Sequence, residues 1–136
     1  MVELIFVIII VGILSAIAVP KFQGVSEEAQ ISKASSVLAA VRMALSTERQ
    51  KRILRGDTAA ITSLGDVFTN FSAAADGSRA TVLEYPPAPC GGKGCWSNAG
   101  LSYTYKFPDT GDAKFKLAGN RLVCDDNATD CAKLEN

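Results

Sequence analysis

The N-terminal stretch of the chain is almost uniformly apolar. Between residues 4 and 19 the only polar side chain is Ser15, and two further apolar residues stand on the other side of a single carboxylate, Glu3. About 20 residues of helix, at roughly 1.5 Å each, cover a hydrocarbon core of about 30 Å. The pattern predicts a helix over residues 1–20 that is long enough to cross a membrane.

A cleaved signal peptide is the competing interpretation of this stretch. Such a peptide has a basic region before the apolar run and a small-x-small cleavage site after it. This sequence has neither feature, because residues 16–18 lead directly into Val19, Pro20 and a long helical pattern. The membrane helix is the favoured interpretation.

After Pro20 the apolar residues recur at steps of three and four, with charged residues between them. The apolar positions are Phe22, Val25, Ala29, Ala34, Val37, Leu38, Val41, Ala44 and Leu45. This spacing predicts an amphipathic helix over residues 21–55 with one packing face. Arg49, Lys51, Arg52 and Arg55 stand at its end, followed by Gly56. Cations near a helix C-terminus complement its dipole and glycine favours the C-cap, so we infer no nucleic-acid site from this cluster.

The remainder, residues 56–136, predicts a globular head. Residues 56–77 indicate a loop with one short helix, and β-prone runs follow at residues 80–85, 101–107, 114–117 and 121–124. In the second run Leu101, Tyr103, Tyr105 and Phe107 alternate onto one face, which we expect to cover the amphipathic helix. The expected fold class is α+β: a long N-terminal helix, apolar then amphipathic, packed on a small antiparallel sheet.

Composition narrows the possible functions. Lys and Arg total 14, Asp and Glu total 14, and there is no His, so nothing indicates a specific nucleic-acid site. The absence of His also removes the commonest general base and transition-metal ligand. No nucleophile–base pair, phosphate loop or carboxylate pair is recognisable, so we expect a non-enzyme without cofactor. A membrane-anchored enzyme or binding module is the remote alternative.

Four cysteines, Cys90, Cys95, Cys124 and Cys131, lie in the C-terminal third. An even number beside a membrane-targeting segment indicates disulfides formed outside the cytoplasm and a disulfide-closed C-terminal region. Pairing Cys90 with Cys95 and Cys124 with Cys131 closes the shortest loops, but strand pairing could instead join an early cysteine to a late one. Zinc is a weaker alternative, because the spacing between the cysteines does not suit it.

The first 22 residues, MVELIFVIIIVGILSAIAVPKF, resemble the start of mature type IV pilins and of the related pseudopilins of type II secretion. The shared features are Glu3 near the start of an apolar helix, Gly12 nine residues later, and Pro20 where the amphipathic half begins. Family members usually begin Phe-Thr-Leu-Ile-Glu after a peptidase removes a basic leader. We therefore expect a leader and two mature residues to be missing before Met1; a shortened native start at Met1 is the alternative.

The resemblance implies a structural subunit that polymerises with copies of itself into an extracellular filament on the bacterial surface. It implies an inner-membrane pool before assembly, a prepilin peptidase that N-methylates the new terminus, and a dedicated pilus assembly machinery. A major type IV pilin serving attachment and motility is favoured, with a major pseudopilin as the alternative. Pseudopilins more often use calcium in the C-terminal region, and oxygen ligands for such a site are available at Asp109, Asp112, Asp125, Asp126 and Asp130. No spacing compels a metal, and we assign none.

Glu3 is the predicted assembly residue. A charge at the bilayer centre costs about 2.5 to 3.5 kcal/mol, so such a residue is usually paired or functional. In the family its partner is the N-terminal amine of an adjacent subunit. A Glu3 that reaches the membrane surface without a partner is the alternative.

Two further expectations concern the helix and the C-terminal loop. Glycine and proline cost about 1 and 3 kcal/mol in a helix interior, so we expect regular hydrogen bonding to be lost somewhere between Gly12 and Pro20 in the filament. Asn127, in the acceptor tripeptide Asn-Ala-Thr preceded by Asp125, is a glycosylation candidate, whereas Asn70 should remain bare.

Overall fold

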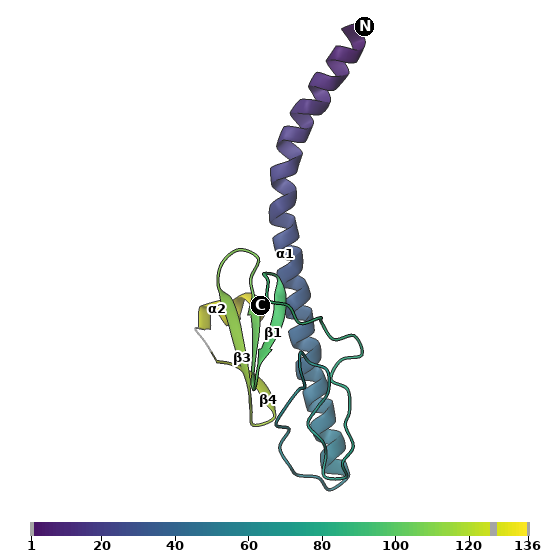
Figure 1. Cartoon of the computed structure of the whole chain (residues 1–136), viewed down its shortest axis with the longest axis vertical. Coiled ribbons are helices and arrows are strands. Elements are labelled where there is room, and N and C mark those ends of the chain that lie inside the picture. The colour runs from purple at the N-terminus through teal and green to yellow at the C-terminus, as the bar shows by residue number, and fades with distance from the viewer. Residues whose placement is uncertain (1, 126–127, 136) are drawn as a thin grey trace.

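One long helix organises the whole subunit. A computed structural model of the chain describes residues 2–125 and 128–135. Helix α1, Val2–Leu54, has 53 residues and is therefore about 80 Å long. Figure 1 shows its N-terminal half standing clear of the head, while its C-terminal half runs along the sheet and loops. The predicted continuous helix through the apolar and amphipathic segments is present.

The head contains a four-stranded antiparallel sheet and one short helix. The elements are β1 (Cys95–Ala99), β2 (Ser102–Lys106), β3 (Asp112–Ala118), β4 (Arg121–Cys124) and α2 (Ala128–Glu135). The strands follow one another as a meander in the order β1-β2-β3-β4, so β1 and β4 are the two edges. Helix α2 contacts both α1 and β3. The α+β class is confirmed.

The core joins α1 to the inner face of the sheet. Ala34, Leu38, Val41 and Leu45 on α1 are buried in one cluster with Tyr103, Tyr105, Phe107 and Phe115. Two tyrosine hydroxyls are used inside the head: that of Tyr105 donates to the Gln30 carbonyl of α1 at 3.1 Å, and that of Tyr103 accepts from the Leu64 amide at 3.0 Å. The sheet therefore covers the amphipathic helix through the face that alternation predicted.

The packing face of α1 is shorter than the apolar spacing suggested. Val25 is 63% exposed and Ala29 is also exposed, and packing begins only with the partly buried Ile31. Leu101 was wrongly placed on the buried face, because it lies in the turn before β2 and is exposed. The head thus covers roughly the C-terminal half of α1.

Two of the predicted head elements were wrong. Residues 80–85 form no strand beyond one bridge between Thr81 and Asn70, and the following Pro86 and Pro87 lack the amide donors that a ladder needs. The strand instead forms at Cys95–Ala99, which pairs with β2. The expected short helix in residues 56–77 is a turn at 65–68.

That turn is incompatible with a right-handed helix. Gly65 and Phe68 both have left-handed φ values, 75° and 58°. Left-handed backbone is uncommon for a bulky residue. Phe68 is nevertheless fully buried, stacked on Tyr103 with ring centroids 4.9 Å apart and edge-on to Trp96 at 5.1 Å. Aromatic packing therefore offsets the backbone strain.

The C-terminus of α1 ends in a glycine cap. The Gly56 amide donates to the Ile53 carbonyl at 2.9 Å, the Asp57 amide donates to the Arg52 carbonyl at 2.8 Å, and Gly56 has a φ of 80°. This pair of hydrogen bonds, together with a left-handed glycine, is the Schellman motif. The expected end near residue 55 is confirmed.

Arg52, one of the cations at the C-terminal end of α1, is buried. Only 1% of its side chain is exposed, and its Nε donates to Oε1 of Glu48, one helical turn earlier and itself 5% exposed, at 3.0 Å. Its Nη2 donates to the Ser72 carbonyl at 2.5 Å. The guanidinium therefore ties the loop after the helix to the end of α1.

We expect Glu48→Ala to lower the free energy of unfolding by about 3 to 5 kcal/mol, because it leaves the Arg52 charge buried without its counter-ion. Replacing both residues together by Met should recover most of that loss. Urea unfolding of the detergent-solubilised subunit, followed by circular dichroism, measures both variants. A loss below about 1 kcal/mol for Glu48→Ala, the range of a surface pair, would contradict a buried pair.

Asp57, just after the end of α1, is hydrogen-bonded to the loop that follows the helix. Its carboxylate accepts the amides of Ala59 and Ala75, each at 2.9 Å. The Ala75 bond, then the Ala59 bond and the nearby Arg52 charge, hold the pKa of Asp57 below its usual value. A lowered folded pKa means that the charged form stabilises the fold above the unfolded pKa of about 3.9, and that this contribution is lost as the pH falls through the folded pKa.

We therefore expect Asp57→Asn to be less stable than wild type at neutral pH, with the difference shrinking below about pH 3.9 and vanishing below the folded pKa. Urea midpoints measured across this pH range test it. Asp66→Asn is the matched control, because the exposed carboxylate of Asp66 accepts no hydrogen bond within the described part of the chain. A pH-independent difference for Asp57→Asn would contradict the assignment.

Candidate assembly surface

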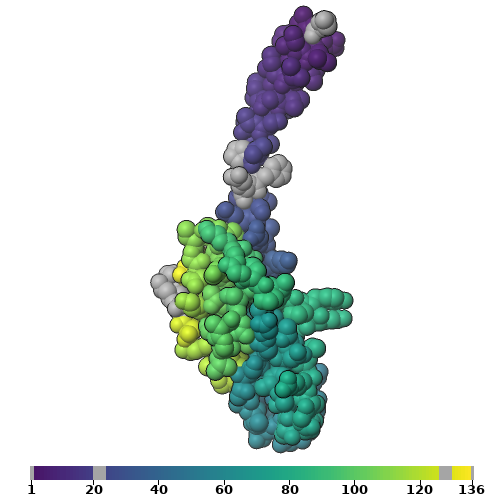
Figure 2. All heavy atoms as spheres, viewed as in Figure 1, coloured from purple at the N-terminus to yellow at the C-terminus, as the bar shows by residue number. Residues whose placement is uncertain are grey.

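The N-terminal half of α1 presents an apolar surface on all sides. Its large apolar side chains are exposed by between 51% at Ile9 and 71% at Leu4. Figure 2 shows this purple segment projecting away from the head. The exposed positions are Val2, Leu4, Ile5, Phe6, Val7, Ile8, Ile9, Ile10, Val11, Ile13, Leu14, Ile17 and Val19.

This exposed surface requires a partner outside the subunit. By length and composition α1 is able to cross a membrane, and none of its most apolar window is buried within the subunit. Exposed apolar surfaces far larger than those of ordinary soluble monomers mark membrane or protein interaction sites. Lipid and other copies of the same helix both satisfy that requirement.

Glu3 interrupts this surface in the first turn of α1. Its side chain is exposed, and within residues 2–125 and 128–135 no basic group forms an ion pair with it. A helix N-terminus carries partial positive charge and favours a carboxylate there. In an apolar environment the partial charge of the helix N-terminus neutralises the Glu3 carboxylate only in part. Glu3 is therefore free to accept a cationic partner from another molecule.

Gly12 and Pro20 both lie within continuous helical backbone in the isolated subunit. Between them, the Ser15 hydroxyl donates to the Val11 carbonyl at 2.7 Å. Such back-bonding to the carbonyl four residues earlier often bends a helix, and Figure 1 shows α1 curving in its N-terminal half. The expected loss of hydrogen bonding concerns the filament and stays a prediction.

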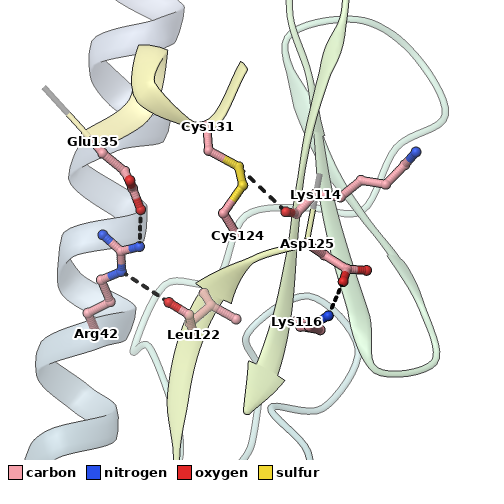
Figure 3. The surroundings of a disulfide bond; sticks show 8 residues. All are labelled: Arg42, Lys114, Lys116, Leu122, Cys124, Asp125, Cys131 and Glu135. Carbon is pink, nitrogen blue, oxygen red and sulfur yellow. Dashed lines mark hydrogen bonds and ion pairs between the residues drawn. A yellow bond between two sulfur atoms is a disulfide. The ribbon is translucent and has the colours of Figure 1, made fainter. Parts of the chain in front are cut away.

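Both disulfides occur in the pairing with the shortest loops. Cys90 is joined to Cys95 and Cys124 to Cys131. The first closes a surface loop just before β1, whereas the second joins the end of β4 to α2 through the buried Cys131. Figure 3 shows the second bridge between these elements, with the side chain of Arg42 nearby.

Helix α2, absent from the sequence-based expectation, is fastened to α1. The Ser35 hydroxyl donates to the Leu134 carbonyl at 2.8 Å, and Arg42 forms an ion pair with Glu135. Arg42 also donates from Nε to the Leu122 carbonyl on β4 at 3.4 Å. The C-terminal end of the chain is therefore attached to α1 by polar contacts as well as by the core.

Three of the acidic residues considered for calcium are paired with lysines. Asp109 lies 3.8 Å from Lys133, Asp112 lies 3.7 Å from Lys114, and Asp125 pairs with Lys116. Among the residues that the structure describes, no group of three metal-ligating side chains occurs. Asp126 and Asn127, and with Asn127 the glycosylation candidate, lie outside the described residues.

Comparison with known proteins gives one close relationship. The chain is 31% identical to a protein of Moraxella nonliquefaciens described as "Fimbrial protein", over 124 residues that cover 90% of this chain and 73% of that protein. No family model matches the chain. No solved structure matches it either.

Proposed function

We propose that this chain, which belongs to the pilin family of fimbrial proteins, polymerises as the major subunit of a type IV pilus. At the general level the family gives the chain the role of a structural subunit of a surface filament. The observation that carries the finer proposal is the apolar helix over residues 2–19, which packs on nothing within the subunit. Bundling this helix with copies of itself covers that surface without lipid.

In the proposed mechanism the subunit first resides in the inner membrane through the N-terminal half of α1. A prepilin peptidase then processes its N-terminus, and an assembly machinery moves the helix from lipid into the filament core. Glu3 pairs there with the N-terminal amine of an adjacent subunit. That pairing neutralises two charges in an apolar core and fixes the axial position of each added subunit.

The alternative within the family is a major pseudopilin of type II secretion. The pilus is favoured because the C-terminal region is closed by the Cys124–Cys131 disulfide and three of its acidic residues, Asp109, Asp112 and Asp125, are paired with lysines. Negative-stain microscopy of filaments sheared from source cells distinguishes the two. Long, abundant fibres at native expression support the pilus, and fibres found only on overexpression support the pseudopilin.

The subunit is proposed to act without catalysis. Two grooves at the surface are lined by a mixture of apolar, aromatic and polar residues, with Glu135 as the one carboxylate among their described lining residues. The buried titratable groups Glu48, Arg52 and Asp57 are occupied in contacts between α1 and the adjoining loop. These groups therefore serve the fold, and attachment and motility would be properties of the filament.

We expect Glu3→Ala to lower the yield of sheared filaments by at least about tenfold, the effect of losing roughly 1.4 kcal/mol per added subunit. Immunoblots of whole cells should show an unchanged amount of subunit, because Glu3 contacts nothing in the head. Glu28→Ala is the control, since Glu28 is exposed on α1 outside the apolar half. Filament yields equal to wild type in Glu3→Ala would contradict the charge-pairing mechanism.

The helix between Gly12 and Pro20 should lose regular hydrogen bonding when it enters the filament. Proline lacks a donor and clashes with the carbonyl four residues earlier, at Ala16, and close neighbours in a filament core can compensate for the freed groups. A density map of the filament at side-chain resolution measures this directly. Continuous α-helix through the segment, as in the isolated subunit, would refute it.

A further inference from the structure

A proline-rich loop carries the most exposed aromatic side chain of the head. From residue 56 onward, the large apolar side chains exposed in the described part of the chain are Tyr85, at 86%, and Leu101, at 60%. Tyr85 is the first residue of the sequence Tyr-Pro-Pro-Ala-Pro, which is followed directly by Cys90. Figure 2 shows a finger from this teal-green part of the chain projecting from the head.

This loop is held in a restricted conformation. Its prolines fix φ and favour an extended, semi-rigid backbone. Its end is fastened twice, by the Cys90–Cys95 disulfide and by the Cys90 amide, which donates to the Trp96 carbonyl at 3.3 Å. A projecting side chain on such a loop loses little conformational entropy when it is buried against a partner. We call residues 84–86, Glu-Tyr-Pro, the knob.

A groove lies at the opposite edge of the sheet. It has a volume of about 570 Å³ and runs between α1 and β4; we call it the α1–β4 groove. Figure 3 shows this region, with Arg42 reaching from α1 toward Leu122 and Glu135. Five of the residues that line it are Arg42, Leu45, Arg121, Leu122 and Val123.

The chemistry of the groove suits the knob. Leu45 and Leu122 are buried beneath the groove, and the half-buried Val123 supplies apolar surface at it. Arg42, whose side chain is 38% exposed, supplies a guanidinium, and an aromatic ring packs well against both. Arg121 is exposed at the groove and forms no ion pair within the described residues. Glu84, beside Tyr85, is likewise exposed and has no ion-pair partner among those residues. The knob thus brings a free carboxylate and the groove a free guanidinium.

The knob and the groove cannot meet within one subunit. The loop lies against the β1 edge, where it shares a surface with Trp96 and Gln30, whereas the groove lies against β4, the other edge. At about 100° per residue, Gln30 and Arg42 also lie on opposite flanks of the buried row of α1. Complementary patches on opposite sides of one molecule make a heterologous contact, which generates an open helical polymer.

We propose that the knob of one subunit occupies the α1–β4 groove of a neighbouring copy of this chain, with Tyr85 against Arg42 and Val123 and with Glu84 paired to Arg121. The inference rests on the proposed function, since it describes a lateral contact between heads in the polymer. It supplies a second connection between subunits, outside the helical core. It also assigns to the filament the side chain of Arg121, which forms no ion pair within the described residues.

A charge exchange tests the contact. Glu84→Arg and Arg121→Glu should each lower the yield of sheared filaments by about tenfold, and the double variant should return the yield to near the wild-type level. Tyr85→Ala should lower the yield similarly and Tyr85→Phe should not, because the ring makes the contact. Whole-cell immunoblots control for the amount of subunit. Wild-type yields in the single variants, or a double variant no better than either single one, would overturn the proposal.

Cross-linking gives an answer that does not depend on yield. Filaments that carry Glu84→Cys together with Arg121→Cys should form a ladder of disulfide-linked oligomers on oxidation, whereas each single variant should not. Absence of the ladder from intact double-variant filaments would overturn the contact while leaving polymerisation through α1 in place. Normal polymerisation of Tyr85→Ala with loss of attachment to surfaces would instead assign the knob to an external partner and contradict the proposal. Failure of wild-type cells to make filaments would count against the proposed function itself.

Discussion

The subunit cannot cover the apolar surface of its own longest helix, and its other features follow from that constraint. The apolar core of the head includes α1 only from about Ile31 onward, and residues 2–19 remain exposed around the full circumference of the helix. No rearrangement of a four-stranded sheet and a short helix could enclose a segment of that length. The exposed helix therefore needs lipid or further copies of itself in place of water, and composition makes either environment favourable.

The C-terminal half of α1 serves the opposite purpose, because it completes a core that the sheet cannot form alone. Small isolated sheets need packing against another element to be stable in water. Here the buried row of Ala34, Leu38, Val41 and Leu45 supplies that element, and the tyrosine hydroxyls of the sheet and the turn bind backbone groups around it. One helix thus belongs both to the head and to the proposed filament core, so the head cannot separate from the polymer without losing its own core.

Sequence reasoning succeeded where a property is carried by neighbouring residues. The apolar helix, the glycine cap and the short disulfide loops are all local patterns. It failed where contacts between residues far apart in the sequence determine the structure. Residues 80–85 have good strand propensity, but β1 forms at Cys95–Ala99 because that segment aligns with β2. The burial of Arg52 was not predicted, because it depends on Glu48 and on a carbonyl 20 residues away. The α1–β4 groove was likewise invisible, since α1, β4 and α2 meet only in the folded chain.

The positions of the polar contacts between α1 and the head indicate how tension would pass along such a filament. Tension enters each subunit through α1 and must reach the head through contacts that resist sliding along the helix axis. Apolar side chains resist such sliding weakly, because one apolar neighbour substitutes for another, whereas hydrogen bonds and ion pairs have fixed partners. Polar contacts of α1 with the head are spread along the packed part of the helix: Gln30 and Ser35 near its start, Arg42 in the middle, and Arg52 near the cap. The Cys124–Cys131 bridge then joins β4 to α2, so that the two elements held by Arg42 cannot move apart. This arrangement keeps the head in a constant axial position on α1, which any regular contact between neighbouring heads requires.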